Sequence, residues 1–124
     1  MKKVIATTEA PAAIGPYSQA IDLGNIVFCS GQIPVNPATG EIPEGITAQT
    51  EQALANVAAL LKAASLTLAD VVKTTVFLAD MAHFGAMNEV YANHFPSPFP
   101  ARSAVAVRDL PKGVLVEVEV IAAR

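Results

Sequence analysis

The chain has 124 residues, of which 52% are hydrophobic and 15% are charged, and its formal net charge at pH 7 is −3. This size and apolar content predict a single domain, residues 1–124, with a sizeable core, and they exclude an intrinsically disordered chain. The lysines and arginines are scattered, no apolar run approaches the ~18 residues of a membrane span, and no signal-peptide core follows the first residues. We therefore expect a cytoplasmic protein that binds neither nucleic acid nor membrane.

The first part of the chain predicts a loop and a β-hairpin. Prolines and a glycine make residues 7–18 a loop. Strands are expected over residues 19–23 and 26–30, because Gly24 and Asn25 between them are typical of a tight turn.

The middle of the chain predicts a helix, a strand and a second helix. After a loop over residues 34–45, a helix is expected over residues 47–64 from a hydrophobic stripe at helical spacing: Leu54, Val57, Ala58 and Leu61, with Gln49, Gln52, Asn56 and Lys62 elsewhere. Residues 71–78 are rich in valine and threonine and predict a strand. Asp80 suits the N-cap of a helix over residues 83–94, whose stripe is Phe84, Met87, Tyr91 and Phe95.

The last part predicts two more strands, residues 101–107 and 114–122, after three prolines that end the second helix. Five strands are located in this way. The order of elements indicates an α+β single-domain sandwich with a mixed sheet, and two helices can cover only one of its faces.

Alternation along the last two strands predicts which residues lie on the uncovered face. In the final strand one face carries Val114, Val116, Val118 and Val120, and the other carries Leu115, Glu117, Glu119 and Ile121. In the preceding strand Ser103, Val105 and Val107 oppose Arg102, Ala104 and Ala106. If both valine faces lie under the helices, Arg102 and Glu117 share the uncovered face. That face is too apolar for water, so we expect another subunit to cover it.

Arg102 is the most informative single residue. It stands at the start of a strand that the pattern predicts to be buried, where an unpaired charge would cost several kcal/mol. A guanidinium presents a planar fork of donors that matches a carboxylate. From the residues alone, two interpretations of Arg102 are equally open: a ligand-binding group, or a salt bridge that ties the sheet or an interface together.

Five segments in order along nearly the whole chain match a known family. They are Gly15-Pro16-Tyr17-Ser18-Gln19-Ala20, Ser30-Gly31-Gln32-Ile33-Pro34, Val72-Lys73-Thr74-Thr75-Val76-Phe77-Leu78, Phe99-Pro100-Ala101-Arg102-Ser103, and Leu110-Pro111-Lys112 followed by Val116-Glu117-Val118-Glu119. With these segments the chain resembles RidA, the reactive intermediate (imine) deaminase A group of the YjgF superfamily.

The resemblance implies a chorismate-mutase-like fold, which we expect here as a mixed six-stranded sheet with two helices on one face. It implies a homotrimer with sites in the clefts between subunits. The implied activity is hydrolysis of reactive 2-imino acids and their enamine tautomers, namely 2-aminoacrylate, 2-iminobutanoate and 2-iminopropanoate, to 2-keto acids and ammonia. No cofactor is implied, and the role is control of metabolite damage.

The resemblance also assigns roles to particular residues. Arg102 matches the family's carboxylate-binding arginine, and Glu117 matches the acidic residue that positions or activates water. Other pocket residues of the family match Tyr17, Ser30, Gly31 and Asn88. The chain departs from the family at Ala104, where many members have cysteine, which leaves substrate range and thiol-based regulation open.

Other interpretations of the sequence remain. Glu119 is the rival of Glu117, and a non-catalytic, chaperone-like trimer that binds a small carboxylate is the alternative to an enzyme. RNA cleavage is disfavoured by the acidic charge balance. Cys29 is expected to be a buried, inert thiol, and His83 and His94 have no partners at metal-ligand spacing, so no metal site is expected.

Overall fold

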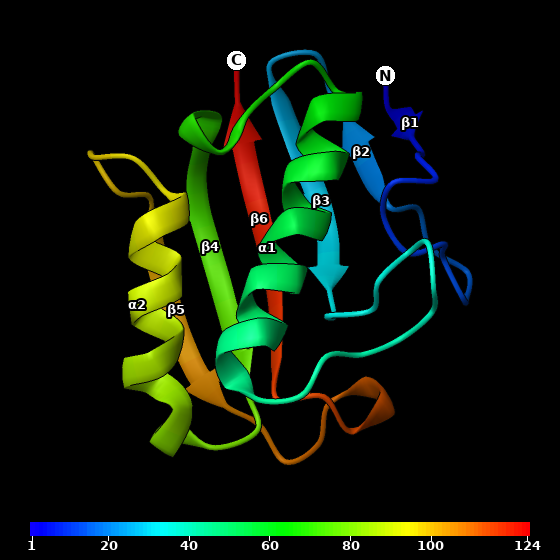
Figure 1. The fold of residues 1–124 in the computed structure, drawn as a ribbon. Coiled ribbons are helices and arrows are strands. Elements are labelled where there is room, and N and C mark those ends of the chain that lie inside the picture. The colour runs from blue at the N-terminus through cyan, green and yellow to red at the C-terminus, as the bar shows by residue number, and fades with distance from the viewer.

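The computed structural model describes residues 1–124 as two layers, a six-stranded sheet and two helices packed on one of its faces (Figure 1). The strands are β1 (Lys3–Ile5), β2 (Ala20–Asp22), β3 (Ile26–Gln32), β4 (Val71–Leu78), β5 (Ala101–Ala106) and β6 (Val116–Ala123). Their order across the sheet is β1-β2-β3-β6-β4-β5. Only β4 and β5 are parallel, so the sheet is mixed. The predicted α+β architecture is confirmed, and β1 is the strand that no pattern located.

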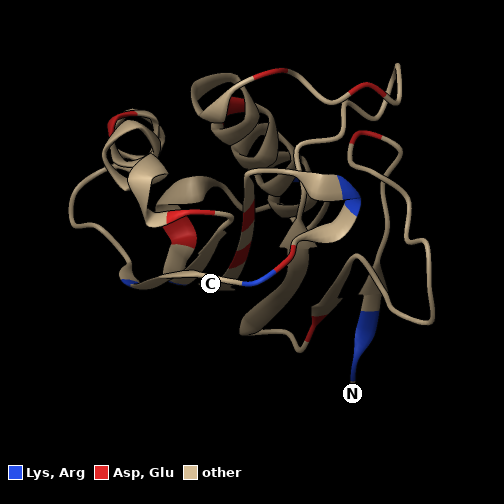
Figure 2. Cartoon of the chain, turned by 90° about the horizontal axis from the view of Figure 1, so that it is seen from below, with Lys and Arg blue, Asp and Glu red and all other residues tan.

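Both helices begin close to where the sequence predicts. Helix α1 spans Ile46–Ala63 and helix α2 spans Phe84–His94. Asp80 does act as a cap, but of the short 3-10 turn Met81–His83 that leads into α2, where its side chain accepts a hydrogen bond from the Ala82 N–H at 2.8 Å. Viewed from below, both helices lie on the same side of the sheet (Figure 2). We call the opposite side the open face.

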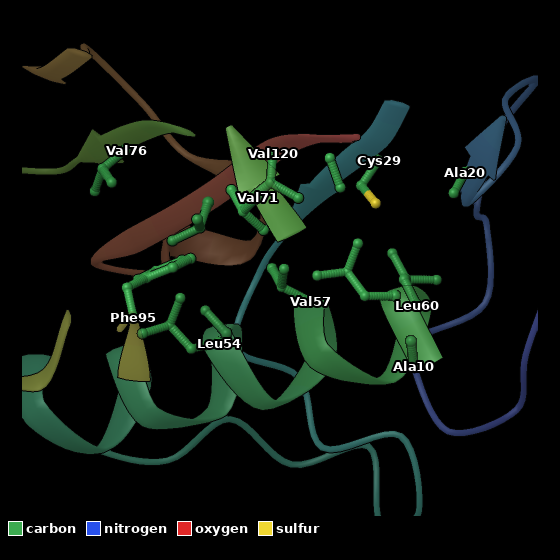
Figure 3. Packing of buried hydrophobic residues seen from close by; sticks show 14 of the residues in the cluster. Ala10, Ala20, Cys29, Leu54, Val57, Leu60, Val71, Val76, Phe95 and Val120 are labelled. Carbon is green, nitrogen blue, oxygen red and sulfur yellow. The ribbon is translucent and has the colours of Figure 1, made fainter. Parts of the chain in front are cut away.

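The core lies between the sheet and α1. The face of β6 that carries Val116, Val118 and Val120 is buried, as the alternation predicts, and it packs with Leu54 and Val57 of α1 in one cluster (Figure 3). Burying several aliphatic side chains of this size stabilises the fold by about 1.5–3 kcal/mol for each side chain. The helices are thus held by the valine face of the sheet.

Two polar side chains of α1 that the pattern placed away from the stripe are also buried. The Asn56 amide donates hydrogen bonds to the carbonyls of Ile33 and Val35, both at 3.0 Å. The Gln49 carbonyl accepts the Leu115 N–H at 2.7 Å. These amides are buried because they satisfy backbone groups of the loops that lead away from β3 and into β6.

The prediction that residues 101–107 form a buried strand is wrong. Strand β5 is the edge of the sheet, and its residues are exposed or half-buried. An edge strand has only one neighbour, here β4, and only α2 lies over it. Arg102 is therefore half-buried at the rim of the core rather than enclosed in it.

Candidate active site

Arg102 lies against helix α2. In the sheet it is paired with Thr74, which is completely buried under the helices, so the Arg102 side chain is on the helix face. One of its terminal nitrogens, Nη1, donates a hydrogen bond to Asn88 Oδ1 at 2.7 Å. Its guanidinium carbon lies 4.7 Å from the centre of the Tyr91 ring and 5.4 Å from that of Phe84, both cation–π distances.

A cavity of about 450 Å³ opens beside this arginine; we call it the Arg102 cavity. Its lining consists of Asn88, Tyr91, Ala92, Phe99, Pro100 and Arg102. Within one copy of the chain Arg102 takes part in none of the four ion pairs, and Asn88 is its only hydrogen-bond partner. The remaining donors of the guanidinium are free to bind an anion.

Glu117 lies on the open face, in a second cavity of about 390 Å³ that we call the Glu117 cavity. Its lining consists of Ile14, Tyr17, Ser30, Gly31, Ile33, Pro111, Glu117 and Glu119. Burial among these residues, and secondarily the charge of Glu119, raises the pKa of the Glu117 carboxyl. A carboxylate with a raised pKa is better suited to accept a proton near neutral pH.

Gly31 is needed where it stands because Glu117 occupies the space of its missing side chain. A Cβ on Gly31 would overlap the Glu117 carboxylate oxygen and lie 2.9 Å from its carboxyl carbon. The backbone of β3 and the carboxyl group are therefore in direct contact. Any larger residue at this position would push the carboxyl group away.

Tyr17 and Ser30 border the same cavity from the loop and from β3. The Tyr17 hydroxyl accepts the Ile14 N–H at 3.4 Å, and the side chain is half-exposed. The Ser30 hydroxyl donates to the Ser18 carbonyl at 2.7 Å. Both hydroxyls thus hold the loop before β2 in place, and Tyr17 also extends toward a neighbouring hollow of about 530 Å³ on the open face that includes Lys73 and Glu119.

The expectation that Arg102 and Glu117 share one face is wrong. Glu117 pairs with Phe77 of β4 and lies on the open face, whereas Arg102 pairs with Thr74 and faces α2. Ala104 and Ala106 pair with Val76 and Leu78, so they too lie on the helix face rather than the uncovered one.

The predicted alternation within each strand is confirmed. The prediction of which face of β5 matches which face of β6 is wrong. Ser103 and Val105, not Arg102, lie on the same face as Glu119 and Glu117. Apolar content cannot set this phase on an edge strand, since neither face of β5 is fully buried. One copy of the chain therefore holds Arg102 and Glu117 in two separate cavities on opposite sides of the sheet.

Two side chains that support these cavities, Gln19 and Tyr91, were not predicted from the sequence to do so. Gln19 is buried, and its amide bonds to the backbone of Thr7, Ala10 and Pro11, which shapes the loop beneath the Glu117 cavity. Tyr91, which we expected in the core, also faces Arg102. For Gln19, the sequence signal was a polar residue next to apolar ones. For Tyr91, it was a hydroxyl group on the hydrophobic stripe of the helix.

The one cysteine of the chain, Cys29, lines neither of these two cavities. Cys29 is buried, and this burial raises the pKa of its thiol to about 12. No group of three or more His, Cys, Asp or Glu side chains is placed to hold a metal ion. None of the helices combines the length and apolarity needed to cross a bilayer. Lysines and arginines are dispersed over the ribbon rather than gathered on one surface (Figure 2).

The fold is a small α+β sandwich with a cavity beside Arg102 on the helix side of the sheet and a cavity that contains Glu117 on the open face. The family described as endoribonuclease L-PSP matches residues 7–124. The chain belongs to this family, the YjgF/RidA family.

Three relatives illustrate the similarity. A 2-iminobutanoate/2-iminopropanoate deaminase of Escherichia coli is 54% identical over 127 residues, covering 100% of this chain and 99% of the relative. The crystal structure of the E. coli YjgF gene product superposes with a TM-score of 0.93 at 53% identity, covering 98% of each chain. E. coli TdcF with bound serine superposes with a TM-score of 0.93 at 49% identity, also covering 98% of each chain.

Proposed function

We propose that this protein hydrolyses small 2-imino acids to 2-keto acids and ammonia, as a 2-iminobutanoate/2-iminopropanoate deaminase. Full-length relatives about half identical to the chain are named for this activity. The similar TdcF structure holds serine, a small molecule with a carboxylate next to a nitrogen-bearing carbon. The observation that carries the proposal is the Arg102 fork, which faces a cavity without any acidic partner from its own copy.

The proposed reaction needs a carboxylate anchor and a proton acceptor. Arg102 binds the substrate carboxylate through charge-assisted hydrogen bonds, each contributing about 1.5–3 kcal/mol. Glu117 accepts a proton from water as the water oxygen bonds to C2 of the protonated imine. The resulting carbinolamine then collapses. Glu117 returns the proton to nitrogen, the C–N bond breaks as the C=O bond forms, and the hydroxyl proton passes to the departing ammonia, so that a 2-keto acid and ammonium leave. The balance is imine plus water giving keto acid plus ammonia, with no cofactor.

We infer that the Arg102 cavity and the Glu117 cavity act as two half-sites from different copies, since the sheet separates Arg102 from Glu117 in one copy. We propose that a homotrimer brings the Arg102 cavity of one copy against the Glu117 cavity of the next, with Asn88 on one side of the cleft and Tyr17, Ser30 and Gly31 on the other. The open face supports this assembly: Phe28 and Val105 are 44% and 46% exposed in a single copy, and a second copy would remove them from water.

The family description also contains an endoribonuclease name. The charges do not favour that activity for this chain. The net charge is −3, and the lysines and arginines are scattered along the chain, whereas binding to a phosphate backbone needs clustered basic residues (Figure 2). Imine hydrolysis therefore remains the function that the two half-sites support best.

The test supplies the substrate from a dehydratase that releases 2-aminoacrylate or its homologue from serine or threonine. Added wild-type protein is expected to speed the loss of imine absorbance, and Arg102→Ala to remove about 100-fold or more of this effect while the protein stays folded and oligomeric. The matched control is Arg108→Ala, since Arg108 is almost fully exposed outside both cavities. Full activity of Arg102→Ala would contradict the assigned site. Keto-acid binding without any turnover would favour the non-catalytic alternative.

A further inference from the structure

Tyr91 differs from the other aromatic residues of helix α2 because it faces both the core and Arg102. Its side chain is only 5% exposed, yet its ring borders the Arg102 cavity. Its hydroxyl shares a 2.8 Å hydrogen bond with the hydroxyl of Thr74, which is completely buried on β4. The ring is thus tied at its far end to the strand next to the one that carries Arg102.

Three residues of α2 surround the guanidinium from one side. Phe84, Asn88 and Tyr91 are spaced four and three residues apart, so they share one face of the helix. Asn88 orients one edge of the guanidinium by a hydrogen bond, and the two rings contact it at 5.4 and 4.7 Å. An arginine side chain has many rotamers, and an aromatic face under its plane selects among them.

The hydroxyl of Tyr91 anchors its ring to Thr74, whereas the ring itself faces the guanidinium. Phe95, one turn later, packs against the same ring at 4.4 Å and is equally buried without a polar group. Burial raises the pKa of the Tyr91 hydroxyl. The ring therefore stays a neutral phenol, and it supports the guanidinium without cancelling its charge.

We propose that Tyr91, anchored by Thr74, is a positioning residue that holds the Arg102 guanidinium in the orientation needed to bind the substrate carboxylate. The proposal rests on the function proposed above. Tyr91 acts through Arg102 and takes no part in proton transfer. Its removal is therefore expected to weaken carboxylate binding more than it slows the chemical step.

The experiment compares Tyr91→Leu, Tyr91→Phe and Phe84→Leu by steady-state imine hydrolysis, by inhibition with the product 2-oxobutanoate, and by thermal unfolding. Tyr91→Leu is expected to raise KM and the inhibition constant by about tenfold each, with a smaller change in kcat. Tyr91→Phe keeps the ring and is expected to recover most of this loss. Phe84→Leu, at a half-buried position, is expected to raise KM by about threefold, because its ring is farther from the guanidinium.

The matched control is Val90→Ala, which removes packing from the same helix at a buried residue outside the Arg102 cavity. It is expected to lower Tm and leave KM unchanged. If Tyr91→Leu and Phe84→Leu lower only Tm and leave KM and the inhibition constant as in the wild type, the positioning role is overturned while the proposed function stands. If Tyr91→Leu does not fold, the KM of Phe84→Leu decides. If the wild-type protein itself hydrolyses no imine, the proposed function fails instead.

Discussion

The two faces of the sheet differ in how completely a single copy of the chain buries their side chains. On the helix face, Val116, Val118 and Val120 of β6 are at most 2% exposed. On the open face, the alternating residues Glu117 and Glu119 are half-buried and exposed, and Phe28 on β3 is 44% exposed. One face of β6 thus belongs to the buried core, and its other face remains partly exposed to solvent.

From this difference we expect the helix face to determine mainly stability, and the open face to determine mainly assembly and the proposed chemistry. Substitutions on the helix face are expected to change the free energy of unfolding, and substitutions on the open face to change assembly and chemistry. Arg102 is the exception, because it performs its proposed role from the helix side at the sheet edge.

The largest expected effect comes from placing a charge on the open face. Phe28→Asp is expected to prevent assembly, because an aspartate there would be buried between copies, and to lower imine hydrolysis by about 100-fold or more as the half-sites separate. Sedimentation velocity and the imine-loss assay measure the two effects. Met81→Asp is the control, since Met81 is similarly exposed but lies in the turn before α2. A trimeric, active Phe28→Asp protein would contradict the expected role of the open face in assembly.

A smaller loss of activity is expected from Gly31→Ala. The added methyl group would displace the Glu117 carboxyl, a flexible group, so activity is expected to fall by about 30-fold while Tm changes little. Gly85→Ala on α2 is the matched control, because a Cβ there meets no neighbouring atom. Wild-type kcat for Gly31→Ala would show that the position of this carboxyl group does not matter.

On the helix side of the sheet, Leu54→Ala is expected to lower stability and to leave activity unchanged. Leu54 is completely buried, so its truncation should lower the free energy of unfolding by about 2–5 kcal/mol. Denaturant titration measures the loss, and kcat/KM measured well below Tm should equal that of the wild type. A tenfold fall in kcat/KM of the folded variant would show that the two faces are not separable.

The smallest effect concerns the stability of Glu117→Gln. The pKa of Glu117 is raised in the folded state, so the folded protein binds this proton more tightly than the unfolded chain, and stability decreases as the pH rises above the ordinary value of 4.5. Glu117→Gln removes the free-energy cost of keeping this partly buried carboxyl ionised at pH 7. It is expected to raise Tm at pH 7 by about 1–3 °C and to abolish activity.

The gain in Tm should vanish as the pH falls below 4.5, where the carboxyl becomes protonated in both states. The exposed loop variant Glu41→Gln serves as the control and should show no such pH-dependent gain. A Glu117→Gln protein that is less stable than the wild type at pH 7 would mean that the carboxylate is favourably paired.

Much of the architecture follows from local patterns. Strand β4 has the predicted bounds, α1 and α2 begin within one residue of the prediction, and the valine face of β6 is buried as its alternation indicates. These elements are long and strongly periodic, which is why their identity can be derived from the sequence. Strand β1 has only three residues and no such period.

The sequence names candidate site residues, but it does not predict how they are arranged. Tyr17, Ser30, Gly31 and Glu117 do border one cavity, and Asn88 and Arg102 border another. Their membership came from segments that resemble a family. The separation of the two groups by the sheet depends on the pairing of Arg102 with Thr74, which no local pattern specifies.

The sequence by itself determined the class of fold and the valine core, because hydrophobic periodicity acts locally along the chain. Only the tertiary structure decided that Arg102 faces α2 and Glu117 faces away from it. A shift of one residue in the phase of a strand exchanges its two faces, and at the sheet edge no buried face penalises either choice. Contacts with Asn88, Tyr91 and Phe84 selected the one observed.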